Sequence, residues 1–130
     1  MRLSQAIRIG AARRPQGFGE YFSYSTSGDA LTSSCALGAA LDGLGHADCT
    51  AAEAVKVLAE FTELWEQVDP AVLDRFTEKH GGRSREVASQ GVGHPNDFTV
   101  RSSLTLHEQI ELWNDDLRLS REEIADLIES

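Results

Sequence analysis

Residues 105–128, TLHEQIELWNDDLRLSREEIADLI, contain the clearest structural pattern in the chain. Thr105 and Glu108 have the spacing of a capping box, in which each side chain satisfies an unpaired backbone donor at the start of a helix. After this box, apolar residues recur at the period of one helix face: Leu106, Ile110, Trp113 and Leu117. The pattern predicts an amphipathic helix that packs its apolar face into a core.

A second helix is predicted directly afterwards. Ser120 and Glu123 repeat the capping-box spacing, and Leu119 and Ile124 occupy the positions of a hydrophobic staple, which fixes how the chain enters a helix. The two adjacent helices predict a helical hairpin. Residues 119–127 also resemble the opening helix of a helix-turn-helix, but the acidic character of this region argues against DNA binding.

The middle of the chain predicts two further helices. Thr50 and Glu53 form a third capping-box pattern, which should open the longest helix of the chain. Its apolar stripe recurs at helical steps and is widened by two more apolar residues: Val55, Leu58, Phe61, Trp65 and Val68, with Val57 and Leu64. Asp69 and Pro70 match an N-cap followed by proline at the first helical position, and predict a helix over 70–79. We expect both tryptophans of the chain to be buried, since each lies on such a stripe.

The first part of the chain predicts two short helices. Residues 3–13 carry an amphipathic pattern that starts behind Ser4 and is closed by Pro15. Small residues and leucine over 35–41 predict a buried helix that another helix approaches closely. Between them, residues 16–34 are rich in glycine and serine and predict a loop or a short irregular hairpin.

Together these elements predict a mainly α protein, a compact bundle of about five to six short helices. Long loops are expected at 16–34 and 81–103; the second is polar and aperiodic, and is the loop in which function would first be sought. A chain of 130 residues has the usual size of one domain, so we expect a single helical domain over residues 1–130.

The charge of the chain bears on its partners. A formal net charge of −9 at pH 7 argues against a nucleic-acid partner, because nucleic-acid-binding domains usually present a basic face to the phosphates. No apolar run approaches the roughly 20 residues needed to cross a bilayer, so we expect a cytoplasmic protein with no membrane partner. Residues 1–15 contain arginines and no acidic residue. These arginines either dock on acidic side chains of the same protein or face an anionic ligand.

Two stretches form a combination typical of a known family: SCALGAAL at 34–41, and WND at 113–115 followed by SREEIA at 120–125. The combination is similar to a family of small, uncharacterised bacterial and phage proteins of unknown function. These proteins carry Cys-x-Leu-Gly-Ala followed much later by Trp-Asn-Asp or Leu-Asn-Asp. No activity is established for that family, so the resemblance implies no catalytic residue.

Cys35 is the first candidate for chemistry. Ser33 or Ser34 should cap its helix, and the positive end of the helix dipole would lower the pKa of a thiol in the first turn. A nucleophilic cysteine also needs a nearby base, and the chain offers four histidines: His46, His94, His80 and His107. The alternative, which we expect, is that Cys35 is a buried and unreactive side chain, because desolvation disfavours the thiolate.

Two metal or anion sites can be considered. His46 and Cys49 form one local pair of zinc ligands, and Cys35 with His80 or His94 could be distant partners, but zinc signatures usually contain two close pairs. We therefore expect a plain turn and no metal there. The glycines of residues 91–97 could let backbone amides approach an anion, but no strand and helix flank them in the manner of a phosphate loop, and a turn-rich connection is expected.

Trp113, Asn114 and Asp115 could form a polar recognition site. The structural alternative gives each residue a mechanical role. Trp113 would fill the core, Asn114 would adopt the left-handed conformation that ends a helix, and Asp115 would hydrogen-bond into the following turn.

No nucleophile, acid pair or metal set stands out, and no cofactor is implied. The sequence therefore favours a non-enzymatic cytoplasmic domain that acts through a protein partner. Two alternatives remain open: a small enzyme that uses Cys35, and an acidic mimic of nucleic acid. A cleft joining Cys35 to a histidine would favour the enzyme, and a clustered acidic face on the helices of 51–68 and 105–129 would favour the mimic.

Overall fold

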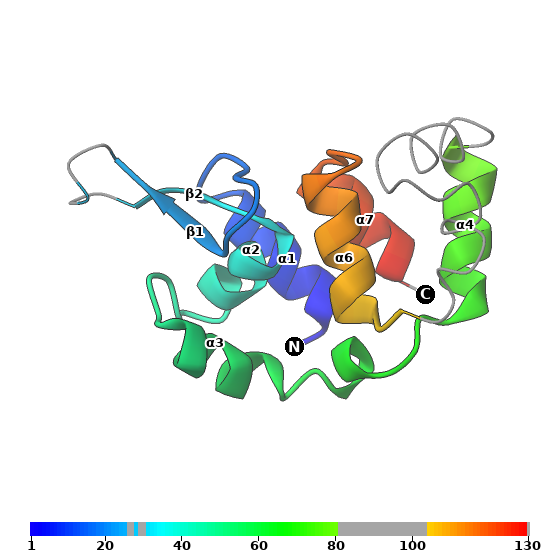
Figure 1. Cartoon of the computed structure of the whole chain (residues 1–130), viewed down its shortest axis with the longest axis horizontal. Coiled ribbons are helices and arrows are strands. Elements are labelled where there is room, and N and C mark those ends of the chain that lie inside the picture. Colours follow the sequence, from blue (N-terminus) through cyan, green and yellow to red (C-terminus); the bar gives the residue numbers. More distant parts are fainter. Residues whose placement is uncertain (26–27, 29–30, 81–103, 130) are drawn as a thin grey trace.

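The computed structural model describes residues 1–25, 28, 31–80 and 104–129. In these ranges the chain forms six α-helices, one 3₁₀-helix and one antiparallel hairpin (Figure 1). The elements are α1 (Leu3–Ala11), β1 (Phe22–Tyr24), β2 (Leu31–Ser34), α2 (Ala36–Gly43), α3 (Ala51–Leu58), η1 (Thr62–Trp65), α4 (Pro70–His80), α6 (Leu106–Asp115) and α7 (Arg121–Ile128). The prediction of a mainly α fold with short helices is confirmed. The loop predicted at 81–103 lies outside the described residues.

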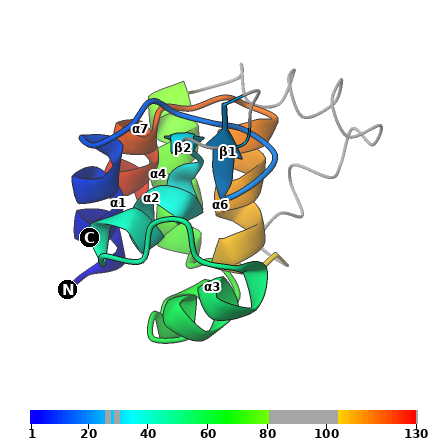
Figure 2. The same cartoon turned by 90° about the vertical axis from the view of Figure 1, so that its left-hand side faces the viewer.

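Helices α1 and α2 cross at the centre of the fold with their backbones in contact. A Cβ atom added to Gly10 of α1 would lie 1.8 Å from the carbonyl oxygen of Ala39 in α2. At the other end of the crossing, a Cβ atom on Gly43 would lie 2.1 Å from the carbonyl oxygen of Ala6. Helix α7 packs on α1 as well (Figures 1 and 2). The predicted close approach of a second helix to residues 35–41 is thus confirmed.

The C-terminal hairpin forms as predicted. The Thr105 hydroxyl accepts a hydrogen bond from the Glu108 amide at 3.2 Å, and the Ser120 hydroxyl accepts one from the Glu123 amide at 3.0 Å. Both capping boxes are complete. Trp113 is fully buried on α6. None of the helices in the described part is long and apolar enough to span a bilayer.

The single long helix predicted after Thr50 is wrong, although its capping box is present. Helix α3 ends at Leu58, and the chain continues into the 3₁₀-helix η1. The buried side chains there are Leu58 at the end of α3, Phe61 just before η1 and Leu64 within η1. Leu64 therefore takes the core position expected for Trp65, which is 42% exposed.

The region before α2 also differs in detail. Helix α1 begins after Arg2, and Ser4 lies inside the helix instead of capping it. The predicted long loop at 16–34 contains the hairpin of β1 and β2, so the irregular hairpin was the correct alternative. Phe22 fixes this hairpin to the core, with 4% of its surface exposed.

Three of the four N-terminal arginines, Arg8, Arg13 and Arg14, dock on acidic side chains of the same protein, as one of the two predicted interpretations has it. The Arg8 guanidinium lies 2.6 Å from Asp126 and 2.9 Å from Glu129, both near the end of the described chain. Arg13 and Arg14 each lie 3.1 Å from the carboxylate of Asp42, whose side chain is almost fully buried.

Candidate functional site

Cys35 is buried at the start of α2. The prediction that Ser33 or Ser34 caps this helix is wrong, because Cys35 has extended backbone angles and is itself the N-cap. Its Sγ atom accepts a hydrogen bond from the Gly38 amide at 3.3 Å. Burial nevertheless raises the pKa of the Cys35 thiol to about 11, so desolvation outweighs the amide hydrogen bonds that favour the thiolate. The thiol is protonated at neutral pH.

The other predicted ligands and bases are not gathered around Cys35. His46 is exposed beyond the end of α2, and Cys49 is half-buried before α3. His80 ends α4, whereas His94 and the loop 91–97 lie outside the described residues. In the described ranges no hydrogen bond joins Cys35 to a histidine, and no group of three potential ligands could hold a metal ion.

We expect Cys35 to react slowly with iodoacetamide in the native protein. In a Cys49→Ser variant, labelling at neutral pH should proceed only through opening of the fold, at least about tenfold more slowly than labelling of Cys49 in the matched Cys35→Ala variant. Mass spectrometry of the alkylated protein measures both rates. Rapid native labelling of Cys35, with a titration midpoint below the free-cysteine value of about 8.5, would contradict this assignment.

Asn114 joins three parts of the chain from a buried position on α6. Its Oδ1 atom accepts hydrogen bonds from Gln16 Nε2 at 2.8 Å and from the Ala36 amide at 3.1 Å. Its Nδ2 group donates to the Gly17 carbonyl at 3.0 Å and to Asp115 Oδ1 at 2.7 Å. The predicted left-handed conformation at Asn114 is wrong: Asn114 lies within the helix, and Arg118, with a φ of 54°, adopts that conformation.

Arg121 completes this internal joint. Its guanidinium is buried and donates to the hydroxyl and carbonyl of Ser34, at 3.0 and 3.3 Å, and to the carbonyl of Arg14 at 2.5 Å. The SCALGAAL, WND and SREEIA stretches therefore meet in one polar network that holds α2, α6 and α7 together. Asn114 and Arg121 have no free polar surface to offer a ligand.

A different cluster, which we call the aromatic face, consists of Tyr21, Trp65, His107 and Glu111. The rings of Trp65 and His107 are stacked, with centroids 4.9 Å apart and planes inclined by 21°. His107 Nδ1 lies 3.1 Å from Glu111 Oε1, and His107 Nε2 lies 3.5 Å from the Tyr21 hydroxyl. A neutral His107 that donates from Nδ1 to Glu111 can accept from Tyr21 at Nε2.

The electrostatics of the aromatic face favour binding over catalysis. Burial, followed by the charge of Glu111, raises the pKa of Tyr21, so its phenol remains protonated and is a poor nucleophile at neutral pH. Burial also raises the pKa of Glu111; a positive charge on His107 opposes this rise, and the nearby charge of Asp115 adds to it. Among the described residues, no arginine or lysine forms an ion pair with Glu111 or Asp115. The face is therefore aromatic, acidic and without a cation of its own.

Sequence reasoning missed this cluster. His107 and Glu111 are four residues apart on one helix, a spacing that brings side chains together and could have been noticed. The exposure of Trp65 had no such signal, because it depends on the change from an α-helix to a 3₁₀-helix. The contribution of Tyr21 comes from a hairpin far away in the sequence.

Comparison of the chain with known protein families, with curated proteins and with solved structures finds no match. The interpretation of the aromatic face therefore depends on its own geometry and charge.

Proposed function

We propose that this protein is a non-enzymatic binding domain whose aromatic face binds a basic, arginine-containing segment of a partner protein. The observation that carries the proposal is the 42% exposed fraction of Trp65, a large ring held in place by stacking on His107. Tryptophan is enriched at the energetic centres of protein interfaces, and a ring that is already fixed loses little conformational entropy on binding.

The charge of the face supports a cationic partner. A guanidinium stacks on an indole ring and pairs with a carboxylate in two parallel hydrogen bonds, which an ammonium does not match. The Glu111 side chain, 50% exposed and next to His107, is placed to accept such a pair. No arginine or lysine of the described chain pairs with this carboxylate. A bound arginine would supply the missing positive charge.

The two alternative functions receive less support. An enzyme that uses Cys35 would need an accessible thiolate, and this thiol is buried and protonated. A mimic of nucleic acid would need an array of free carboxylates. Many acidic side chains of the described chain are instead engaged in capping boxes or ion pairs: Asp42, Glu53, Glu108, Glu123, Asp126 and Glu129.

The proposal predicts that a hexa-arginine peptide binds with a saturable change in Trp65 fluorescence. Trp65→Ala should weaken binding at least about tenfold, because both the stacking surface and the fixed ring are lost. The matched control is Val55→Ala, which removes another exposed apolar side chain, 51% exposed, from α3. Isothermal titration calorimetry measures the affinity of each variant.

Three further measurements make the test specific. Glu111→Gln should weaken binding, and binding to the native protein should decline as the pH falls, because the raised pKa of Glu111 brings protonation to higher pH than for an ordinary glutamate. Hexa-lysine should bind more weakly than hexa-arginine. Equal affinity of the native protein and Trp65→Ala for hexa-arginine would reject the aromatic face as the binding site.

A further inference from the structure

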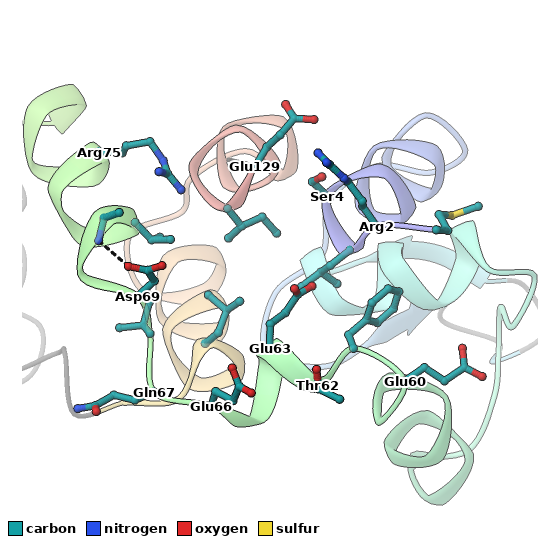
Figure 3. A pocket seen from close by; sticks show the side chains of 18 residues that line it. Arg2, Ser4, Glu60, Thr62, Glu63, Glu66, Gln67, Asp69, Arg75 and Glu129 are labelled. Carbon is teal, nitrogen blue, oxygen red and sulfur yellow. Dashed lines mark hydrogen bonds between the residues drawn. The ribbon is translucent and has the colours of Figure 1, made fainter.

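A separate pocket of about 610 Å³ opens between α1, α4, α7 and the chain from Glu60 to Asp69 (Figure 3). Its volume lies within the range of about 300 to 1,000 Å³ that is usual for small-molecule sites. Trp65 does not line it, so the pocket is distinct from the aromatic face. Its lining includes apolar side chains from several elements: Phe61, Val68, Val72 and Leu106.

One wall of the pocket carries three carboxylates, from Glu60, Glu63 and Glu66. Glu63 belongs to η1, and Glu66 follows this helix directly in an extended conformation. Figure 3 shows both on the chain segment that faces α1 and α7. None of the three forms an ion pair or a side-chain hydrogen bond with another described residue. This wall is therefore suited to a cation.

The opposite wall has the reverse polarity. Helix α1 begins there with Arg2 as its N-cap, but no side chain accepts from its first amides and its first turn has no acidic residue. The positive end of the helix and the Arg2 guanidinium thus face the pocket together. Glu129 also lines this wall, but Arg8 already binds its carboxylate at 2.9 and 3.0 Å.

Ser4 is the second, independent sign of a ligand at this wall. Only 4% of the surface of Ser4 is exposed. Ser4 lines the pocket and makes no side-chain hydrogen bond with any other described residue. Figure 3 places Ser4 between Arg2 and Glu129. Its hydroxyl is not among the enclosed polar atoms of the described chain, so it is open to the pocket and free to bond a ligand. A carboxylate bound between Ser4, Arg2 and the first amides of α1 would provide a partner for it.

We propose that this pocket binds a free basic amino acid. The carboxylate of the ligand lies against Arg2, Ser4 and the start of α1, and its side-chain cation lies against Glu63 and Glu66. The methylene groups between them pack on the apolar lining. The two walls have opposite charge and share one cavity, so the site suits a ligand that carries a positive and a negative group.

The test compares L-lysine with two analogues that each lack one charged group. Cadaverine lacks the carboxylate, and norleucine lacks the side-chain ammonium. Isothermal titration calorimetry should show saturable binding of L-lysine, and each analogue should bind at least about tenfold more weakly, as expected when one charged contact is lost. Cadaverine that binds as tightly as lysine would reduce the site to an acidic cluster and overturn the proposal, as would equally tight binding of norleucine.

Variants locate the binding site. Glu63→Gln should weaken lysine binding about tenfold, whereas Glu78→Gln, the same change at an exposed position of α4 outside this pocket, should leave it unchanged. Ser4→Ala should also weaken lysine binding, and circular dichroism will show whether this variant is folded. Arg2→Gln changes the same wall at an exposed position and should likewise weaken lysine binding. Absence of lysine binding at about 10 mM, or unchanged affinity in Glu63→Gln and Arg2→Gln, would overturn the proposal.

Discussion

Replacing Gly10 by alanine is expected to lower the free energy of unfolding by about 3 kcal/mol, enough to unfold a marginally stable domain. The added Cβ atom would lie 1.8 Å from the carbonyl oxygen of Ala39, so α1 and α2 would have to separate. The direction of the stability change identifies its cause. At a helix position free of contacts, the same change stabilises by up to about 1 kcal/mol, because alanine has the higher helix propensity. Urea denaturation followed by circular dichroism measures the difference.

Two controls identify the cause of this loss. Ala12→Ser, at the exposed end of the same helix, should change stability by less than about 0.5 kcal/mol. Adding Ala39→Gly to Gly10→Ala should not restore stability, because the clash is with a backbone oxygen and not with the Ala39 side chain. A Gly10→Ala protein as stable as the native one would mean that the two helices do not approach this closely.

Asn114→Ala is expected to destabilise the protein by about 3 kcal/mol. The substitution leaves the Ala36 amide and the Gly17 carbonyl without their Asn114 partners, and it removes one of the two hydrogen bonds that Gln16 Nε2 donates. Buried donors and acceptors that lose their partner bear the full desolvation penalty. Thermal and urea denaturation should both report the loss.

The matched control removes an exposed amide side chain. Gln5→Ala on α1 should change stability by less than about 0.5 kcal/mol, because Gln5 makes no side-chain hydrogen bond with a described residue. Asn114→Asp separates the two functions of the amide, since aspartate can still accept from Ala36 but cannot donate to Gly17. A small effect of Asn114→Ala would indicate that water replaces the amide in this joint.

Much of the helical structure could be predicted because its signals are local. A capping box needs only two residues three positions apart, and the boxes at Thr50, Thr105 and Ser120 all form. The fate of the chain after Leu58 could not be predicted in the same way. An apolar stripe with the α-helical period includes both Leu64 and Trp65, but the chain leaves the α-helix after Leu58, buries Leu64 and exposes Trp65, and nothing local marks this change.

The candidate sites were predicted less well, because their residues come together only in the tertiary structure. Asn114 was recognised as notable, but its partners at Gln16 and Ala36 belong to distant elements. The same holds for the aromatic face, where Tyr21 reaches His107 from the hairpin. Cys35 shows the opposite case. Its predicted burial is correct, since a run of small apolar neighbours is itself a sign of the core.

The docking of α1 on α7 has a consequence for the synthesis of this protein on the ribosome. Arg8 pairs with Asp126 and Glu129, which lie 118 and 121 positions further along the chain, and the first helix forms part of the central crossing. The N-terminal helix therefore emerges long before the helix that covers it. The crossing of α1 with α2 can form early, but the part of α1 that packs on α7 remains exposed or bound by a chaperone until nearly all of the described chain has been translated. Folding dominated by such distant contacts is slower than folding dominated by neighbours, so completion of the fold should follow translation of α7.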